Sequence, residues 1–522
     1  MMSSSAEPQP NTYILGTIFS MPTEGGGMPA IAVEKRTGDN LISLYSVIIT
    51  LIFIPAWKLI AFTAGRYLHD DVEVVRKQGS PWTSGFRQLL GAFSMPWEEV
   101  KATDKESAGE DEPDTNATRQ GTLFVFSILF FLGSLVAGIF VPPLLVIGAV
   151  APVQPAAVFF PHILPGAGDN EGWKYQALKA PAATRAVGGV GAAMIQGGVS
   201  FDGSSEDYSV RYSYQVTGVD FGLQGHWGRL VQGVDGRCVL VHDWVDDATS
   251  RGLDENSTDV IQYEYYRPWD SQRVAVPVSR NQTFDPPWVT MHLHENIEQT
   301  TNTTGNNSFA MIPHSVGRLS FTSSIDPWYK TDPITGELAD DVPGAHQVLP
   351  TRPALSCWQK DTWSFDGNTV SSIFRLSDLP GLDLPLEWDN FLRIQLSAPR
   401  IFDVGVSLGR SSLVSSTTFL DRVTIGTFDA GSSSLSSDVE RLVWAAYVSS
   451  RDVFRESTMV LERHYVQNDV EAFGRDETPD FAKFVLATPA VATLSLRVLI
   501  SLPVVCVSLW FAHLTITHLY NK

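Results

Sequence analysis

Recognisable catalytic motifs are missing from this sequence. It contains no Gly-x-Ser-x-Gly nucleophile elbow, no phosphate-binding loop, no His-Glu-x-x-His zinc motif and no dinucleotide-binding fingerprint. The N-terminus also lacks the basic start, short apolar core and small-residue cleavage site of a removable signal peptide. Motifs therefore assign no enzyme class, and we expect the first apolar stretch to stay in the chain as an anchor.

Positive charge is in short supply. The chain has 37 Lys and Arg residues against 57 Asp and Glu, which gives a net charge of −20. An acidic surface repels nucleic acid and anionic lipid head groups. We therefore expect no nucleic-acid partner, and we interpret most of the excess acidity as a device that keeps a large polar domain soluble.

Three long apolar stretches stand out, at residues 41–65, 121–141 and 498–519. Each is about as long as the ~20-residue α-helix, rising ~1.5 Å per residue, that crosses ~30 Å of hydrocarbon. The sequence therefore predicts an integral membrane protein with three transmembrane helices, located in the plasma membrane or in a secretory-pathway membrane.

Basic residues and glycosylation sequons predict the orientation. Seven Lys and Arg residues lie between the first two apolar stretches, which places that loop in the cytoplasm. The region beyond the second stretch is then extracellular or lumenal, and four Asn-x-Ser/Thr sequons fall within it. These predicted glycosylation sites are Asn256, Asn281, Asn302 and Asn306. A fifth sequon, at Asn116, falls in the cytoplasmic loop and is expected to be unused.

The predicted organisation follows from these stretches. It comprises a disordered extracellular tail (1–40), a first transmembrane helix (41–65), a cytoplasmic loop with an amphipathic helix (66–120), a second transmembrane helix (121–141), a membrane-proximal apolar segment (142–165), a glycosylated β-rich ectodomain (166–485), a third transmembrane helix (498–519) and a cytoplasmic end (520–522).

Only three cysteines occur, and two of them lie in the predicted ectodomain. Cys506 falls inside the third apolar stretch, where it is most simply a small apolar residue. Cys238 and Cys357 would face an oxidising compartment, in which two thiols usually pair. We therefore predict a disulfide bond between Cys238 and Cys357.

The ectodomain has the pattern of a mainly β structure, a sandwich or a barrel. Apolar and polar residues alternate from Tyr208 to Val216, as half-buried strands require. Further strands are predicted at residues 237–242, 260–266, 288–293, 309–312, 391–396 and 401–408. One long helix is expected near the C-terminal end of the domain, where Ser437 and Glu440 form a capping box before an apolar stripe that reaches Phe454.

Tryptophan is abundant in the ectodomain. Large aromatic side chains can fill a β core, stack on sugar rings or anchor a protein interface. We interpret most of them as core residues, while those in turns leave a binding surface open. The set includes Trp227, Trp244, Trp269, Trp288, Trp328, Trp358, Trp363 and Trp388.

The sharpest chemical candidate is His292-Leu293-His294, followed by Glu298. Alternate residues of a strand face the same way, so two imidazoles and a carboxylate can converge on a divalent metal. The spacing resembles the first metal motif of the cupin family, a β-barrel fold. That resemblance implies His292, His294 and Glu298 as ligands, with His346 the nearest fourth. Pro286 stands where the family has glycine and the second motif is misspaced, so we predict no bound metal or other cofactor.

The layout of spans and ectodomain resembles uncharacterised surface membrane proteins of filamentous ascomycete fungi, a resemblance that implies no activity. The leading hypothesis is a non-enzymatic surface protein in the lipid bilayer whose ectodomain binds a wall polysaccharide or a protein partner. The alternative is a membrane-anchored enzyme that uses the cupin-like metal site or a carboxylate pair, for which His242-Asp243 and Asp246-Asp247 are candidates. The ligand and the oligomeric state stay open.

Overall fold

The structure is a computed structural model that describes residues 11–24, 26–67, 115–158, 160, 172–204, 207–253, 260–270, 273–278, 285–294, 306–335, 342–421, 426–459 and 480–520. The chain divides into two compact units. The large unit consists of residues 1–13, 21–27 and 152–486, and the small unit of residues 14–20, 28–151 and 487–522.

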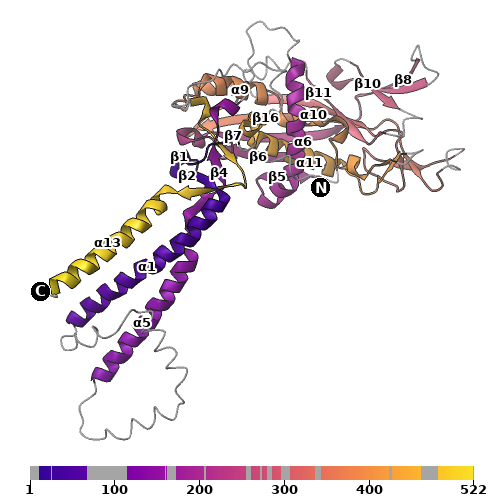
Figure 1. Ribbon diagram of the computed structural model, residues 1–522. Helices are drawn as coiled ribbons and strands as arrows, with labels where there is room; N and C mark the ends of the chain where they lie inside the picture. The colour runs from indigo at the N-terminus through magenta and orange to yellow at the C-terminus, as the bar shows by residue number, and fades with distance from the viewer. Residues whose placement is uncertain are drawn as a thin grey trace, which may run out of the picture. The chain divides into compact units, whose positions relative to one another are not determined.

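The small unit joins three helices to one sheet (Figure 1). The helices are α1 (Lys35–Tyr67), α5 (Thr115–Phe140) and α13 (Leu496–Tyr520). The strands are β1 (Ile18–Met21), β2 (Met28–Glu34), β3 (Val146–Gly148) and β21 (Val491–Ser495), in the order β1-β2-β21-β3. Strand β2 runs directly into α1, β21 runs directly into α13, and β3 follows α5 after a short 3-10 turn (Pro142–Leu145). The starts of α1 and α13 and the end of α5 therefore meet at this sheet.

Helix α1 packs against both of its neighbours. The Ser46 hydroxyl donates a 3.0 Å hydrogen bond to the Gly138 carbonyl of α5, and the Tyr45 hydroxyl donates to the Leu499 carbonyl of α13. The rings of Phe53 and Phe130 meet edge to face at 5.3 Å. Apolar side chains of α1 and α13, among them Tyr45, Ile48 and Leu499, also pack together beside the sheet.

The outward surfaces of these helices are apolar. In α13 no residue between Leu496 and Leu519 is buried, although most of its side chains are apolar. Over the described residues, two helices are long and apolar enough to cross a membrane, at Lys35–Ile60 and Leu496–Leu519, and a shorter apolar helix covers Ile128–Phe140. The prediction of three full spans is therefore supported for two of them, and the second predicted span falls on α5.

The N-terminal tail differs from expectation. We predicted disorder over 1–40, but β1 and β2 lie in this range and α1 begins at Lys35. Strand β2 has five residues paired with β21, so a strand from the far end of the chain supplies its hydrogen bonds. Composition could not reveal that partner, because the two strands are more than 450 residues apart. The amphipathic helix predicted in the 66–120 loop lies outside the described residues.

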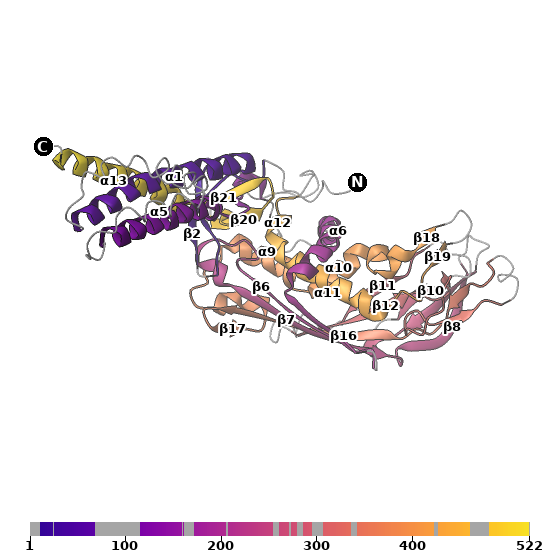
Figure 2. The same cartoon turned by 90° about the horizontal axis from the view of Figure 1, so that it is seen from below.

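The core of the large unit is a curved antiparallel sheet with helices on one face (Figure 2). Its strands, in spatial order, are β11 (Trp288–Leu293), β12 (Asn306–His314), β16 (Ala354–Phe365), β7 (Val231–Val241), β6 (Val210–Thr217) and β5 (Val199–Gly203), and β17 (Asn368–Val370) pairs with β16. The covering helices are α9 (Leu386–Leu396), α10 (Arg400–Leu408) and α11 (Leu435–Arg451), and α6 (Gly172–Gln196) packs against α10 and α11. The mainly β prediction is confirmed, but the described main sheet packs against helices, whereas a sandwich or a barrel was predicted.

Two smaller sheets complete the large unit. Strands β8 (Val245–Leu253), β9 (Val260–Tyr266) and β10 (Val274–Val278) form an antiparallel sheet inserted after β7. Strands β13 (Leu319–Ser320), β14 (Thr331–Pro333), β15 (His346–Val348), β18 (Leu420–Asp421) and β19 (Gly426–Phe428) form the other. Tyr266 and Val276 of the inserted sheet pack with Ile312 and Ala354 of the main sheet.

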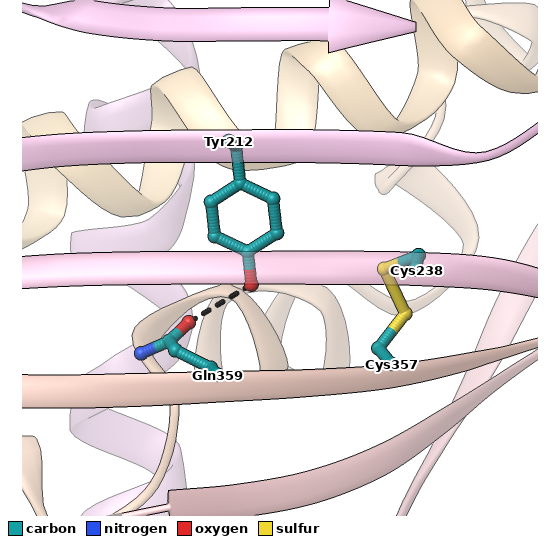
Figure 3. Close-up of a disulfide and its surroundings, with 4 residues drawn as sticks. All are labelled: Tyr212, Cys238, Cys357 and Gln359. Atoms are coloured by element: carbon teal, nitrogen blue, oxygen red, sulfur yellow. Dashed lines mark hydrogen bonds between the residues drawn. A yellow bond between two sulfur atoms is a disulfide. The ribbon is translucent and has the colours of Figure 1, made fainter. Parts of the chain in front are cut away.

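The predicted disulfide is confirmed. Cys238 of β7 and Cys357 of β16 occupy directly paired positions, with their Cα atoms 4.0 Å apart, and the S–S bond joins the two strands (Figure 3). Both side chains are buried. The bond therefore holds together two neighbouring strands that are separated by 119 residues of sequence.

Two predicted strands are wrong. Residues 391–396 belong to α9 and residues 401–408 to α10. The buried residues of α9 are Trp388, Phe391, Leu392 and Leu396, which is a helical spacing that becomes clear only when residues before 391 are included. Helix α6 was not predicted, because Pro181 and several glycines weaken its helical pattern.

The long helix predicted near the end of the domain is present as α11, but its start was misplaced. The N-cap is Ser434, whose hydroxyl accepts a hydrogen bond from the Ser437 backbone N–H. The capping box proposed for Ser437 and Glu440 therefore lies one turn too late. Ser434 and Ser437 are three residues apart in a serine-rich stretch, and the sequence does not show which of them caps the helix.

Candidate binding surface

The predicted metal motif is only partly described. His292 lies in β11, His294 follows its last residue, and Glu298 lies outside the described residues. The His294 ring packs edge to face on Trp269 at 5.0 Å, and burial lowers the pKa of His292. His346 belongs to β15 in a different sheet. Over the part of the chain that the structure describes, no group of three His, Cys, Asp or Glu side chains could hold a metal ion.

Asp246, a member of the candidate carboxylate pair, takes part in ion pairs. Asp246 forms ion pairs with Arg273 at 2.9 Å and with Arg267 at 3.4 Å. The Asp246 carboxylate is therefore already engaged by two guanidinium groups. Asp243 is exposed, and the Asp247 side chain lies outside the described ones.

A buried polar chain crosses the inner face of the main sheet. The Tyr212 hydroxyl donates to Gln359 Oε1 at 3.0 Å, and Gln359 Nε2 donates to Asp361 Oδ1 at 2.8 Å. Burial raises the pKa of Asp361 to about 7. A buried carboxyl with a raised pKa is a common feature of catalytic sites. A catalytic role would also require space for a substrate beside Asp361.

The space beside Asp361 is too small for a substrate. Its cavity is about 10 Å³, enough for one water molecule. Asn307 and Trp363 line it, and each contributes a buried polar atom without a protein partner, Asn307 Oδ1 and Trp363 Nε1. This arrangement fits a water-filled structural network within the core.

The opposite, outer face of the sheet carries a much larger hollow of about 740 Å³. It crosses β5, β6, β7 and β16. Along these strands, residues that line the hollow alternate with residues that face the core. The polar lining residues are Ser200, Ser213, Gln215, Asp235, Lys360 and Thr362. Lys360 and Asp235 occupy directly paired positions. The surface therefore offers hydroxyls, an amide and both signs of charge on a rigid sheet.

Trp358 stands next to this hollow. It precedes Lys360 by two residues in β16, so both side chains point to the outer face, and 43% of Trp358 is exposed. It pairs with Arg237 on one side and with Ser308 on the other. The indole is thus an exposed aromatic side chain within a polar sheet face.

Several other tryptophans of the large unit belong to the core, as expected. Trp328, Trp363 and Trp388 are fully buried, and Trp227 is 7% exposed. The sequence did not single out Trp358. Its neighbours Gln359 and Lys360 continue the buried-exposed alternation of β16, and that alternation is the signal by which its exposure could have been predicted.

Three of the four predicted glycosylation sites lie outside the residues that the structure describes. Asn256, Asn281 and Asn302 fall among the residues that are not described. Asn306 is exposed at the start of β12 and pairs with Lys360, so it borders the hollow. Asn116 is the second residue of α5.

Comparison with curated proteins and with solved structures finds no match. A match does occur to a family described as "Domain of unknown function (DUF8406)", and it covers residues 180–486. The matched segment contains the main sheet, its covering helices, the disulfide and the hollow. Since it includes more than half of the chain, this protein belongs to the DUF8406 family.

Proposed function

We propose that this protein is a membrane-anchored binding protein whose large unit, outside the cytoplasm, takes a glycan chain on the outer face of its sheet. The observation that carries the proposal is the exposed Trp358 beside a polar hollow of about 740 Å³. A sugar ring has apolar C–H faces and polar edges, so it is matched by an indole next to hydroxyl, amide and charged groups.

The membrane part of the proposal rests on the small unit. The start of α1, the end of α5 and the start of α13 all adjoin one sheet, as three spans of alternating direction require. The helices also expose large apolar side chains such as Leu129, Ile139, Val507 and Phe511. Exposure of this kind is costly in water and favourable in a bilayer.

The polar lining supports a binding role over a catalytic one. Among the described residues that line it, Asp235 is the single acidic one, while glycoside hydrolysis ordinarily uses a pair of carboxyl groups. The hydroxyls of Ser213 and Thr362 and the amide of Gln215 provide hydrogen bonds without acid-base chemistry. An open sheet face across four strands also suits an extended ligand.

The experiment is a binding screen with full-length protein against neutral glucan and N-acetylglucosamine oligomers. We expect Trp358→Ala to lower affinity for the retained oligomer by about fivefold or more, since contact of a ring face with an aromatic side chain contributes on the order of 1 kcal/mol. The unfolding stability should change little, because Trp358 is an exposed residue.

The matched control is Phe321→Ala. Phe321 is 50% exposed and follows β13, away from the hollow. It should leave glycan binding intact. Failure of the natural protein to retain any oligomer, or equal binding by the Trp358 variant, would refute the proposal.

A further inference from the structure

A second surface feature lies at the β11 edge of the main sheet, where basic residues gather. Arg318 follows β12 in the turn that leads to β13, and Arg410 lies just after α10 in a 3-10 turn (Gly409–Ser411) that contacts β11. His314 is the last residue of β12. In a chain with a net charge of −20, such a cluster calls for a physical explanation.

Arg318 is the unusual member of this cluster. Its side chain is only 4% exposed, and its Nε atom has no hydrogen-bond partner. Among the described residues its guanidinium forms no ion pair, and Nε is the donor that is buried without an acceptor. Burying an uncompensated guanidinium is costly, so natural proteins normally supply an acceptor.

The groups near Arg318 are engaged with other partners or themselves have an atom without a partner. Asp285 is the acidic group whose charge acts on Arg318, but its Oδ1 is already 2.5 Å from Arg410 Nη1. The His314 ring stacks on Trp288 at 3.8 Å and shares a hydrogen bond with the Thr290 hydroxyl through Nε2. Its Nδ1 is buried and has no partner.

The electrostatics agree with this geometry. The pKa of His314 is lowered to about 3, first by burial and then by the positive charges of Arg318 and Arg410 together with His292. Burial opposes any charge here, whereas the positive charges of Arg318 and Arg410 oppose a further cation and attract an anion.

We infer that Arg318, Arg410 and His314 form a binding site for an oxyanion, that is, a carboxylate, sulfate or phosphate group. The planar guanidinium of Arg318 would bind two of its oxygens, the exposed Arg410 would provide the open side, and His314 Nδ1 would donate a third hydrogen bond. This site does not depend on the proposed glycan surface. The oxyanion can be free in solution or can be an acidic group of a sugar.

The test uses full-length protein and sodium sulfate as the probe, with sodium chloride at matched ionic strength as the reference. Calorimetric titration should show saturable sulfate binding. Arg318→Met should weaken it by at least about tenfold, the effect of losing one hydrogen bond to a charged group. Arg410→Gln, at an exposed position, should weaken sulfate binding to a smaller extent. This variant tests the site if the Arg318 variant does not fold.

A matched control is Arg352→Met. Arg352 is also buried, at 8% exposure, but its guanidinium donates to the carbonyls of Pro327 and Pro350. Without sulfate, Arg352→Met should lower the melting temperature, whereas Arg318→Met should leave it unchanged or raise it, because it removes an unpaired buried charge. With sulfate, the natural protein and Arg352→Met should gain stability and Arg318→Met should not.

Titration with sodium glucuronate distinguishes the two sources of the oxyanion. Binding of glucuronate at least tenfold tighter than binding of acetate supports an acidic sugar, and equal binding supports a free anion. Absence of saturable binding for all three anions, or sulfate affinity that is equal in the natural protein and Arg318→Met, would overturn the inference.

Discussion

The ring of Tyr212 in β6 lies over Gly236 in the neighbouring strand β7, in the space that a Cβ atom would fill. Because Gly236 has no side chain, the Tyr212 hydroxyl reaches past β7 to the side chain of Gln359 on β16 (Figure 3). One glycine thus permits a hydrogen bond between strands that are not adjacent. The strands β6, β7 and β16 are held by side chains as well as by their backbone ladder.

Replacing Gly236 should test this packing. Gly236→Ala places a methyl group in the Tyr212 ring, so we expect a loss of about 1–3 kcal/mol in the free energy of unfolding. Urea unfolding followed by tryptophan fluorescence provides the measurement. Gly188→Ala in α6 is the control: nothing lies within 4 Å of the position that its Cβ atom would take, and alanine favours a helix by up to about 1 kcal/mol over glycine. Equal losses in both variants would contradict the prediction.

Removing the disulfide should also be costly. The double variant Cys238→Ala, Cys357→Ala should lose about 2–5 kcal/mol, since it frees a loop of 119 residues and leaves space in the core. Chemical unfolding under non-reducing conditions measures the loss. Cys506→Ala in α13 should have little effect, because that cysteine is free and is not buried in the core. Unchanged stability of the double variant would show that the strand pairing alone suffices.

The buried Asp361 predicts a dependence of stability on pH. Its folded-state pKa is about 7, whereas an unfolded aspartate titrates near ~3.9, so the folded protein binds the extra proton between these values. The stability contributed by the neutral carboxyl is fully present below about pH 4 and falls by about 1.4 kcal/mol per pH unit until about pH 7. Asp361→Asn keeps an acceptor for Gln359 and cannot ionise.

The comparison of the two proteins isolates this effect from other titrating groups, including Asp438, whose pKa burial raises to about 6. The difference in unfolding free energy between Asp361→Asn and the natural protein should grow in favour of the variant from pH 4 to pH 7. Parallel stability curves would show that Asp361 is ionised in the folded protein.

The proposed orientation predicts which sequons are used. In a eukaryotic host, glycosidase treatment should reduce the mass of the large unit through Asn256, Asn281, Asn302 or Asn306, while Asn116 should remain unmodified. Asn306→Gln is informative because Asn306 borders the hollow and is exposed. Modified Asn116, or a large unit that proteases reach only after the plasma membrane is permeabilised, would reverse the orientation.

The sequence predicted elements whose periodicity is local and unambiguous. Strands β6, β9 and β11 were placed within two residues of their observed bounds, because polar-apolar alternation over six or more residues identifies a half-buried strand. Helices α9 and α10 were assigned as strands, since short apolar runs do not distinguish a buried helix from a strand without their flanking residues. Pro385 and Pro399, each the N-cap of one of these helices, were the overlooked signal.

The candidate sites depended on long-range placement and were less predictable. The pairing of Cys238 with Cys357 followed from a count of cysteines, but the hollow requires residues from four strands, between Gly198 and Thr362 in the chain. Arg318 shows the same limit. Its sequence context gives no sign that burial leaves its Nε atom without an acceptor, because that property belongs to the packed structure.

The disulfide has a further consequence for the segment between its cysteines. This segment holds β8 to β15, and its two ends are joined by both the S–S bond and the β7–β16 ladder. A protease that cuts once anywhere between Cys238 and Cys357 would therefore yield two fragments that stay covalently linked. On a gel they would migrate together until a reductant is added, so nicking of this protein would be invisible under oxidising conditions.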